Sequence, residues 1–480
     1  MRAVQLQSNV DPGFYRMLGA NDEGALLRSF TMKGPSISQR MAAGKVLRKS
    51  VPRASHAIYG PAAKRPDPVE ILERQNATRV QKLVPVRYNR MLASPFAFLR
   101  GSAAVMASDL STSPVSGIQV AACGDMHVSN FGVYATAERN LVFSINDFDE
   151  VHAGPWEWDL KRLAASATVA AKSLGADRAQ SEEAARQCVS SYRRQIRRYA
   201  EMGYLEVWYQ RIDERAILDS LTARSRRIAE KIMLRARARG HISTLDKLTE
   251  QVKGAHRFVE DVPLIVRETH TEKGTPVKVA LDRFLHSYID SLGYDRKLLL
   301  SRYHIVDVAR KVVGVGSVGT ECWMLLLQGA SEDDPIFLQL KEAGESVLAP
   351  HVGFKLPFKH DGHRVVFGQR LTQGSPDIFL GWGEVEGKQF YIRQLADMKG
   401  GAKIDDLETL PDYCRMCGWA LALAHAKSGD AAMIAGYCGN SDALDDAFAR
   451  FATSYAEQTE QDYEALSLAK RTGRIKAAGK

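Results

Sequence analysis

Hydrophobic and polar positions along this chain fall into blocks of helical and of strand-like spacing. Helical spacing, with apolar residues three or four positions apart, covers about 66–112, 157–300 and 411–468. Between these blocks lie short apolar runs bounded by turn residues, which predict strands. These runs are 118–123, 141–147, 311–329, 335–343, and the stretch from RVVFGQRLTQ (364–373) to 389–395. The order of helix, strands, helices, strands and helices predicts a mixed α+β fold.

The first 60 residues are polar, rich in Gly and Ser and weakly periodic, so we expect a loose or peripheral segment. Residues 135–140 (ATAERN) predict a hairpin-like connection ahead of the run at 141–147. A chain of 480 residues is also too long for one small core, which predicts several structural units.

The net charge of +9 favours anionic ligands such as nucleotides. Much of the positive excess lies in three stretches, 191–199, 224–241 and 470–480, in which basic and apolar residues alternate. We interpret these stretches as solvated helix faces, because alternation of this kind is typical of an exposed face. The second stretch has no interleaved aromatic residues for stacking on bases, and we expect no nucleic-acid partner.

The cysteines predict buried thiols in a reducing compartment. Cys414 and Cys417 form one CxxC, but no second pair exists and the surrounding pattern is helical, which disfavours a zinc site. The N-terminus has no apolar stretch suited to secretion, and the longest apolar runs, such as 324–327, are far too short to span a membrane. We therefore expect a cytoplasmic protein without a membrane partner.

The segment CGDMHVSNFG (123–132) follows a strand-like run and contains Asp125 and Asn130. A second acidic cluster, NDFDE (146–150), ends the next run. Two adjacent strands with these ends bring three oxygen-bearing side chains together, as Mg²⁺ requires. Asp125 then orients or deprotonates a hydroxyl nucleophile, as in phosphoryl transfer. The alternative is that these Asp and Asn residues only cap turns.

The sequence GVGSVG at 314–319 is a GxGxxG pattern. A dinucleotide-binding fingerprint requires a helix to begin at the third glycine, but here TECWMLLLQG (320–329) follows, which is typical of a strand. A glycine-rich loop between antiparallel strands is instead the phosphate-covering hairpin of kinases. Lys341, in the next strand-like run, stands where a kinase has its phosphate-binding lysine. Taken alone, it is also compatible with an exposed strand lysine.

His127 raises another alternative, because Asp–x–His also begins the chemistry of metallophosphoesterases. That family requires a GNH motif and further histidines for a two-metal site. Neither GHR (362–364) nor AHA (424–426) supplies them. We therefore interpret His127 as a structural residue that holds the loop through a hydrogen bond.

Two segments, CGDMHVSNFG and INDFDEVHAGPWEWDL, resemble the catalytic segment of aminoglycoside-phosphotransferase-type kinases. The resemblance implies that Asp125 is the catalytic aspartate and that Asp147 is the principal metal-binding aspartate. It further implies Asn130 as a metal ligand and Asp149 as a second acidic ligand. Asp159 is implied as the buried helix aspartate that supports the catalytic loop.

Over roughly residues 45–465 the chain is also similar to the bacterial family of unknown function numbered 2252 (DUF2252). The segments that carry this similarity include RYNRMLASPFAFLRGSAAVMASDL, CGDMHVSNFG, NDFDEVHAGPWEWDLKRLAAS, ARKVVGVGSVGTECW, LQLKEA, GQRLTQGSPDIFLGW, YIRQLADMKG and GWALALAHAKSGD. The family name supplies no reaction, so the expected chemistry rests on the kinase-like segments.

In ordinary kinases the glycine hairpin and the lysine precede the catalytic loop, whereas here both follow it. A two-lobed, protein-kinase-like α+β fold that is circularly permuted and carries a large helical insertion explains this order. The expected units are a flexible N-terminal segment (1–60), the catalytic-loop and metal-site part of the C-lobe (61–164), a helical insertion that caps the substrate (165–302), a nucleotide-binding β region (303–400) and C-terminal helices that complete the C-lobe (401–480).

We therefore expect an ATP- and Mg²⁺-dependent phosphotransferase that acts on a hydroxyl group of an unidentified small molecule or protein. The residues implied in nucleotide binding are Gly314, Gly316, Ser317, Gly319 and Lys341.

The acidic partner that positions this lysine in kinases is not evident. Glu342 follows Lys341 on the same strand and points the opposite way, which leaves Glu345 open. HRVVFGQRLTQ (363–373) is, as an alternative to a strand, a candidate for the helix that carries this acid in kinases, but it offers Gln369 and Gln373 and no acid. Two alternatives therefore stay open: a nucleotide-binding pseudokinase that acts as an interaction module, and an adenylyl-transferring kinase-like enzyme.

Overall fold

The computed structural model describes residue 31 and residues 33–62, 64–353, 356–395 and 398–478. The helices are α3 (Ile37–Val46), α4 (Pro68–Asn76), α5 (Val84–Met91), α6 (Pro95–Gly101), α7 (Ala103–Leu110), α8 (Trp156–Ser173), α9 (Arg178–Ala200), α10 (Tyr204–Tyr209), α11 (Glu214–Ser220), α12 (Ala223–Arg237), α13 (His241–Leu248), α14 (Val277–Asp290), α15 (Tyr294–Leu300), α16 (Asp361–Thr372), α17 (Leu410–Ser428), α18 (Ala431–Cys438) and α19 (Ala443–Arg471). The strands are β1 (Gln119–Ala122), β2 (Phe131–Ala135), β3 (Leu141–Ile145), β4 (His152–Pro155), β5 (Ile212–Asp213), β6 (Thr249–Val252), β7 (Ala255–Phe258), β8 (Ile265–Val266), β9 (His304–Lys311), β10 (Cys322–Gln328), β11 (Pro335–Ala343), β12 (Gly381–Val385) and β13 (Lys388–Gln394).

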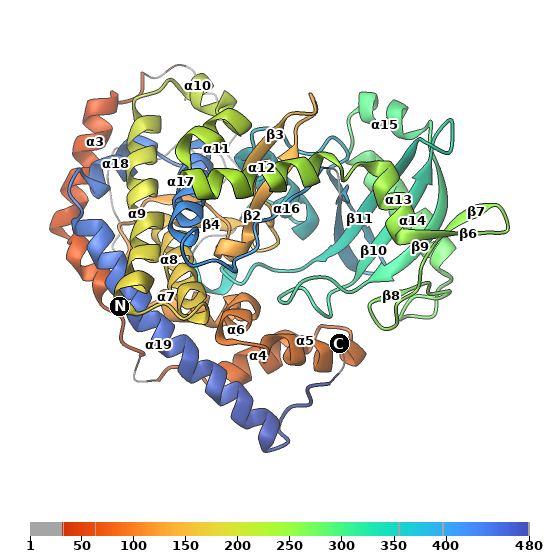
Figure 1. Cartoon of the computed structure of the whole chain (residues 1–480), viewed down its shortest axis with the longest axis horizontal. Helices are drawn as coiled ribbons and strands as arrows, with labels where there is room; N and C mark the ends of the chain where they lie inside the picture. The colour runs from red at the N-terminus through yellow and green to blue at the C-terminus, as the bar shows by residue number, and fades with distance from the viewer. Residues whose placement is uncertain (1–30, 32, 63, 354–355, 396–397, 479–480) are drawn as a thin grey trace.

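Figure 1 shows a mostly helical part, built around α8, α9 and α17, beside a sheet that contains β9, β10 and β11. The mixed α+β class expected from the pattern is confirmed. The strands expected near 118–123, 141–147 and 335–343 form as β1, β3 and β11, and the C-terminal helical block forms as α17, α18 and α19.

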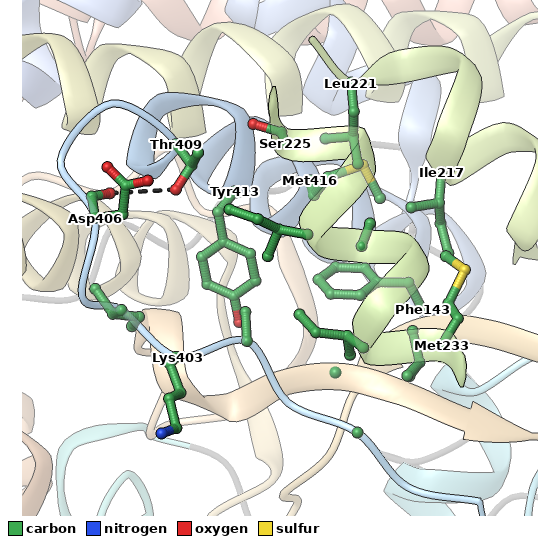
Figure 2. A pocket seen from close by; sticks show the side chains of 18 of the residues that line it. Phe143, Ile217, Leu221, Ser225, Met233, Lys403, Asp406, Thr409, Tyr413 and Met416 are labelled. Atoms are coloured by element: carbon green, nitrogen blue, oxygen red, sulfur yellow. Dashed lines mark hydrogen bonds between the residues drawn. The ribbon is translucent and has the colours of Figure 1, made fainter. Parts of the chain in front are cut away.

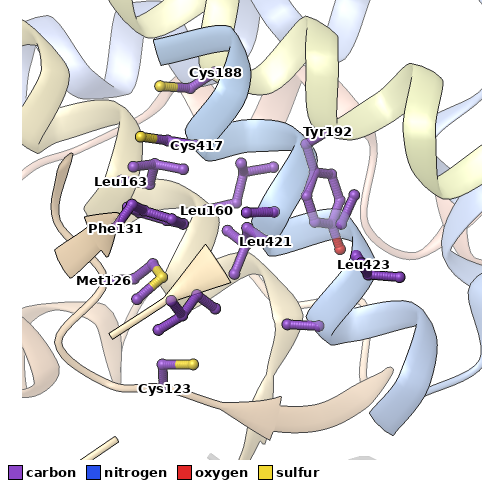
Figure 3. Packing of buried hydrophobic residues seen from close by; sticks show 14 of the residues in the cluster. Cys123, Met126, Phe131, Leu160, Leu163, Cys188, Tyr192, Cys417, Leu421 and Leu423 are labelled. Atoms are coloured by element: carbon purple, nitrogen blue, oxygen red, sulfur yellow. The ribbon is translucent and has the colours of Figure 1, made fainter. Parts of the chain in front are cut away.

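The core of the helical part forms where α8, α9 and α17 pack together, with β1 against α8 and α17 and with β3 against α17. Small residues allow the helices to approach closely: a Cβ on Gly418 of α17 would collide with the backbone of Cys188 on α9. Figure 3 shows Leu160 and Leu163 of α8 together with Leu421 of α17 in this core. All six cysteines are buried and free, so the expectation of buried thiols is confirmed.

The largest sheet has six antiparallel strands in the order β12-β13-β11-β10-β9-β8. Strand β10 is buried on both faces: Trp323 and Leu325 belong to the cluster with α14 and α15, while Met324 and Leu326 belong to the cluster with α13. Because successive side chains of a strand point to opposite faces, burial on both faces produces an unbroken apolar run. The strand predicted after the glycine pattern is confirmed.

The expectation that the two acidic strand ends belong to adjacent strands is wrong. Strand β1 pairs with β4, whereas β3 pairs with β2 and β5. The short 3₁₀ turn Val128–Asn130 redirects the chain, so that β2 forms the hairpin with β3. The two segments still meet, because the amide of Asn146 donates to the carbonyl of Asn130 at 2.8 Å.

The strand-like reading of 364–373 is also wrong, because these residues lie in helix α16 and its C-cap. His360 caps this helix by accepting a hydrogen bond from the amide of His363. Val365 and Val366 then enter the helical core. Tertiary burial of this pair overrides the β propensity of the valines.

The range predicted as one helical insertion, 165–302, is divided between the two parts of the molecule. Helix α9 belongs to the helical core, and β5 pairs with β3. Helix α14 covers one face of the six-stranded sheet, and β8 extends its edge. A sheet with two apolar faces requires helices on both, which draws these segments onto it.

Residues 1–30 of the expected loose N-terminal segment lie outside the described residues. The part that follows is packed: a Cβ on Gly44 of α3 would collide with Met433 of α18. The buried ring of His56 lies 2.6 Å from the Tyr437 hydroxyl. This stretch is therefore not peripheral.

Candidate functional site

The segment after β1 is held by Asp159 of α8. Asp159 Oδ2 accepts a hydrogen bond from the amide of Cys123 at 2.6 Å, and Oδ1 accepts one from the amide of Gly124 at 2.9 Å. Gly124 has φ +74°, and a Cβ there would lie 2.8 Å from the carbonyl oxygen of Glu150, so only glycine fits. His425 Nε2 lies 3.3 Å from Asp159 Oδ2. The buried Asp159 therefore fixes the start of the loop.

Asp125 follows in this loop, with one carboxylate oxygen engaged. Arg162, also on α8, donates to Oδ1 from Nε at 2.9 Å and from Nη2. The other oxygen, Oδ2, lies 3.8 Å from His127 Nε2. Burial lowers the pKa of His127 to about 3, so its ring is neutral, and its buried Nδ1 makes no hydrogen bond to the described residues. Asp125 Oδ2 is therefore positioned to accept a proton or hydrogen bond from an incoming group.

Asn130, Asp147 and Asp149 bring oxygen donors to the same cavity. Asn130 Nδ2 donates to the carbonyl of Asp125 at 2.7 Å, which leaves its Oδ1 for another partner. Asp147 Oδ1 is buried and has no hydrogen-bond partner among the residues that the structure describes. Burial and the neighbouring Asp149 carboxylate raise the pKa of Asp147. Two carboxylates and an amide form a donor set that suits Mg²⁺.

The Asn130 side-chain amide is needed in this set of ligands, because the nearby carboxylates do not form a metal site by themselves. Within the residues that the structure describes, no group of three or more His, Cys, Asp and Glu side chains is arranged to hold a metal ion. The candidate Mg²⁺ site therefore depends on Asn130 and on oxygens from a ligand or from water.

Lys341 of β11 lies beside the two carboxylates. Its Nζ is 2.6 Å from Asp149 Oδ2 and 3.6 Å from Asp147 Oδ1. Tyr391 donates to Asp149 Oδ1 at 2.6 Å. Burial disfavours the ammonium, but the two carboxylates outweigh burial and raise the pKa of Lys341 well above its usual value. Burial also favours the neutral form of Asp149, yet Lys341 and Tyr391 lower the pKa of Asp149 to about 2.

The acidic partner of Lys341 thus comes from the NDFDE segment. Among the described residues, the ion pairs of Lys341 are with Asp147 and Asp149. Glu342 lies on the other side of the strand, as expected, where it accepts from the amide of Glu321 at 2.8 Å. Its carboxylate is 3.4 Å from Lys388 Nζ. The sheet and the NDFDE segment therefore meet at the lysine, although Lys341 and Asp149 are 192 positions apart in the sequence.

The glycine loop joins β9 and β10 and is held by Arg90 of α5 and by Arg79 of the connection between α4 and α5. Arg90 donates to the carbonyl of Gly314 and Arg79 donates to the carbonyl of Val318, both at 2.6 Å. Gly314 has φ +66° and Gly319 has φ +92°, a region that favours glycine. A Cβ on Gly319 would also lie 3.0 Å from Arg79 Cβ.

The tip of this loop lies over the segment that contains Asp125. A Cβ on Gly316 would lie 3.1 Å from the carbonyl oxygen of Arg100 and 4.0 Å from Asp125 Oδ2. Ser317 faces the same cavity, and its carbonyl accepts from Thr320 Oγ1 at 2.8 Å. The loop therefore closes the cavity above Asp125.

The cavity has a volume of about 460 Å³. The residues expected in the site that line it are Asp125, His127, Asn130, Asp147, Asp149, Gly314, Gly316 and Ser317. Three other expected residues lie outside its lining: Asp159 supports the loop from α8, Lys341 is buried beside the acids, and Gly319 packs on Arg79.

Several site residues were missed by the sequence reasoning. Arg162 had a usable signal, because it stands one helical turn after Asp159 and so shares its face of α8. His425 is a polar residue on an apolar helix, and a buried polar group requires a partner. No motif marks Arg79 or Arg100, which enter the cavity from helical segments far from the loop in sequence.

A second cavity, of about 90 Å³, lies between the β2–β3 hairpin, α11, α12 and α17. Figure 2 shows Phe143, Ile217 and Leu221 pointing into it. Tyr413 also lines this cavity, and its hydroxyl donates to the carbonyl of Val128 at 2.8 Å. Its lining is mainly apolar, so we assign the chemistry to the larger cavity.

Within the described part of the chain, no helix combines the length and the apolar character needed to cross a membrane. No curated protein and no solved structure matches the sequence. One family model does match, over residues 79–469. The chain therefore belongs to the family described as "Uncharacterized protein conserved in bacteria (DUF2252)".

Proposed function

We propose that the protein is an ATP- and Mg²⁺-dependent phosphotransferase that acts on a hydroxyl group. One observation carries this proposal: the aspartates at 125, 147 and 149, Asn130 and the glycine loop meet around one cavity, with the buried Lys341 ion-paired to two of these aspartates. Phosphoryl transfer requires this combination of phosphate-binding cations, metal ligands and a carboxylate for the nucleophile.

The residues fit both ligands. Asp147 has a buried oxygen without a hydrogen-bond partner, and Asp149 and Asn130 stand beside it. These three residues hold Mg²⁺, which when bound neutralises charge on the phosphate oxygens. Lys341 and the loop at 314–319 bind the phosphates, because an ammonium and the backbone of a glycine loop suit phosphate oxygens.

In the proposed step, the acceptor hydroxyl donates a hydrogen bond to Asp125 Oδ2. Its oxygen forms a bond to the γ-phosphorus as the bond from that phosphorus to the β,γ-bridging oxygen breaks. The proton passes to Asp125, and ADP leaves with the bridging oxygen. Arg162 fixes the carboxylate through Oδ1, so that the other oxygen faces the acceptor.

The proposal includes a circularly permuted, protein-kinase-like arrangement. The distance of 3.6 Å between Lys341 Nζ and Asp147 Oδ1 supports it, since permutation requires the later sheet to meet the earlier loop. The six buried free cysteines support a reducing, cytoplasmic location.

Labelled ATP tests the proposal. The purified protein is incubated with Mg²⁺ and ATP labelled either at the γ-phosphate or in the adenylate, together with an extract of small molecules and proteins as acceptors. We expect the γ-label to move and the adenylate label to stay. Movement of the adenylate indicates adenylyl transfer instead. Bound nucleotide with neither label moving indicates a pseudokinase.

A further inference from the structure

We infer that the acceptor carries an anionic group, a phosphate or a carboxylate, which Arg79, Arg87 and Arg100 bind inside the cavity. This inference rests on the proposed function and names the substrate class. The three arginines line the same cavity as Asp125.

The inference rests on three guanidinium groups that form no ion pair with a carboxylate of the described residues. Arg87 is fully buried, and its hydrogen bonds go to the neutral acceptors Asn76, Gln75 and the carbonyl of Gly101. Among the described residues, Arg79 donates a hydrogen bond to the carbonyl of Val318, and the Arg100 guanidinium has neither a hydrogen bond nor an ion pair. Carboxylates act on these two arginines only at longer range: Glu150, Glu342 and Asp149 favour the charged form of Arg79, and Asp125 favours that of Arg100. In all three arginines, Nε is buried without a hydrogen-bond partner among the described residues.

Other buried arginines of the chain have carboxylate partners. Arg65 lies 2.7 Å from Asp109 and 2.6 Å from Asp462, and Arg193 lies 2.7 Å from Asp445. Burying a cation without an anion is costly, and the cost is removed when a ligand supplies the anion. The planar fork of a guanidinium matches both phosphate and carboxylate oxygens.

The position of Arg100 assigns this anion to the acceptor. The position that a Cβ on Gly316 would take, at the loop tip, lies 3.1 Å from the carbonyl oxygen of Arg100 and 4.0 Å from Asp125 Oδ2. Burial lowers the pKa of Arg100, and Asp125 opposes this effect. Lys341, which we assign to the nucleotide phosphates, lies elsewhere, on strand β11 of the sheet, with its Nζ against the Asp149 carboxylate. The cavity thus offers separate cations to the two substrates.

Calorimetric titration with inorganic phosphate and with acetate tests the inference, with the full chain alone and saturated with Mg²⁺ and the β,γ-imido analogue of ATP. We expect phosphate or acetate to bind in both states. Arg100→Gln should weaken anion binding about tenfold or more and change nucleotide affinity less than about twofold. Arg79→Gln should weaken anion binding and also nucleotide binding, because Arg79 holds the glycine loop as well. Arg74→Gln, an exposed position on α4, is the matched control and should change neither.

Three results overturn the inference. They are no anion binding by the wild-type protein, equal anion binding by Arg100→Gln, and competition between the anion and the nucleotide, which assigns the arginines to the nucleotide phosphates. A melting curve checks folding of each variant, and Arg100→Lys, which keeps the charge, should retain part of the affinity. Anion binding without any transfer from ATP contradicts the proposed function but leaves the anion site standing.

Discussion

At the scale of single residues, the two oxygens of Asp125 have different surroundings. Arg162 holds Oδ1, and Oδ2 faces the cavity beneath Gly316. A carboxylate fixed in this way presents one oxygen to a hydroxyl nucleophile in a constant orientation, which is how positioning contributes to catalysis.

Asp125→Ala should therefore lower the rate of phosphoryl transfer by about 10²- to 10⁴-fold, the usual contribution of general acid–base catalysis. The affinity for Mg²⁺ and nucleotide should stay within about threefold, since Asp125 is not among the proposed metal ligands. Single-turnover transfer of labelled phosphate and calorimetry measure the two quantities. Asp219→Asn, on an exposed part of α11, is the control. Full transfer by Asp125→Ala would contradict the assigned role.

Asp147→Asn tests the metal site. The change keeps the shape but removes the charge of the carboxylate whose Oδ1 has no hydrogen-bond partner. We expect Mg²⁺ to stop increasing nucleotide affinity, because a neutral amide is a weaker ligand for a hard cation. Titration of nucleotide with and without Mg²⁺ measures this effect, and an unaltered melting temperature shows that the fold is intact. An unchanged Mg²⁺ effect would exclude Asp147 as a ligand.

At the scale of elements, the glycine loop depends on both of its neighbours. Strands β9 and β10 supply the hairpin, while Arg79, between α4 and α5, and Arg90 of α5 fix its carbonyl groups. The loop thus links the sheet to the helical part across the cavity.

Gly319→Ala should disturb this loop. The residue has φ +92°, and a Cβ would lie 3.0 Å from Arg79, so the change costs about 1–3 kcal/mol of backbone strain in the closed loop. We expect nucleotide affinity to fall about tenfold, as measured by calorimetry. Gly344→Ala also lies on the cavity but meets nothing within 4 Å, and should bind normally. Normal binding by Gly319→Ala would show that the loop conformation is not required.

At the scale of the whole molecule, the helical core contains an unusual charge. Lys161 of α8 is fully buried, and its Nζ lies 4.8 Å from the centre of the Phe451 ring. Within the described part of the chain, this Nζ has no hydrogen-bond partner. Burial lowers the pKa of Lys161 to about 8, although Glu157 opposes this effect. Keeping this lysine charged therefore reduces the stability of the protein at neutral pH.

Lys161→Met should raise the free energy of unfolding by about 1–3 kcal/mol at pH 7. Between about pH 8 and the usual pKa of lysine, the unfolded chain binds more protons than the native one, so wild-type stability rises with pH. The gain from the substitution should accordingly shrink above pH 8. Urea unfolding at several pH values measures it. Lys172→Met, at a partly exposed position of the same helix, should change stability by less than about 1 kcal/mol. A destabilised Lys161→Met at pH 7 would refute the argument.

The local pattern of the sequence was sufficient to predict several strands and the short polar segments that follow them. Strands β1, β3, β10 and β11 follow from runs of apolar residues, and the residues at 125, 130, 147 and 149 stand in short polar segments that follow strands. The same reasoning proposed Lys341 from its place after a glycine hairpin. Each of these features depends on residues that are close together in the chain, so a single sequence is enough to predict it.

Tertiary structure alone decided the rest. Lys341 contacts Asp149, and Arg162 contacts Asp125, across segments that are far apart in the chain. Arg79 and Arg100 likewise reach the cavity from segments that are remote from the glycine loop in sequence. Three features of the fold depend on which apolar faces meet. They are the pairing of β1 with β4, the helical state of α16, and the distribution of residues 165–302 between the helical part and the sheet. Local spacing specifies which face of an element is apolar, but the partner of that face is selected by burial in the folded whole.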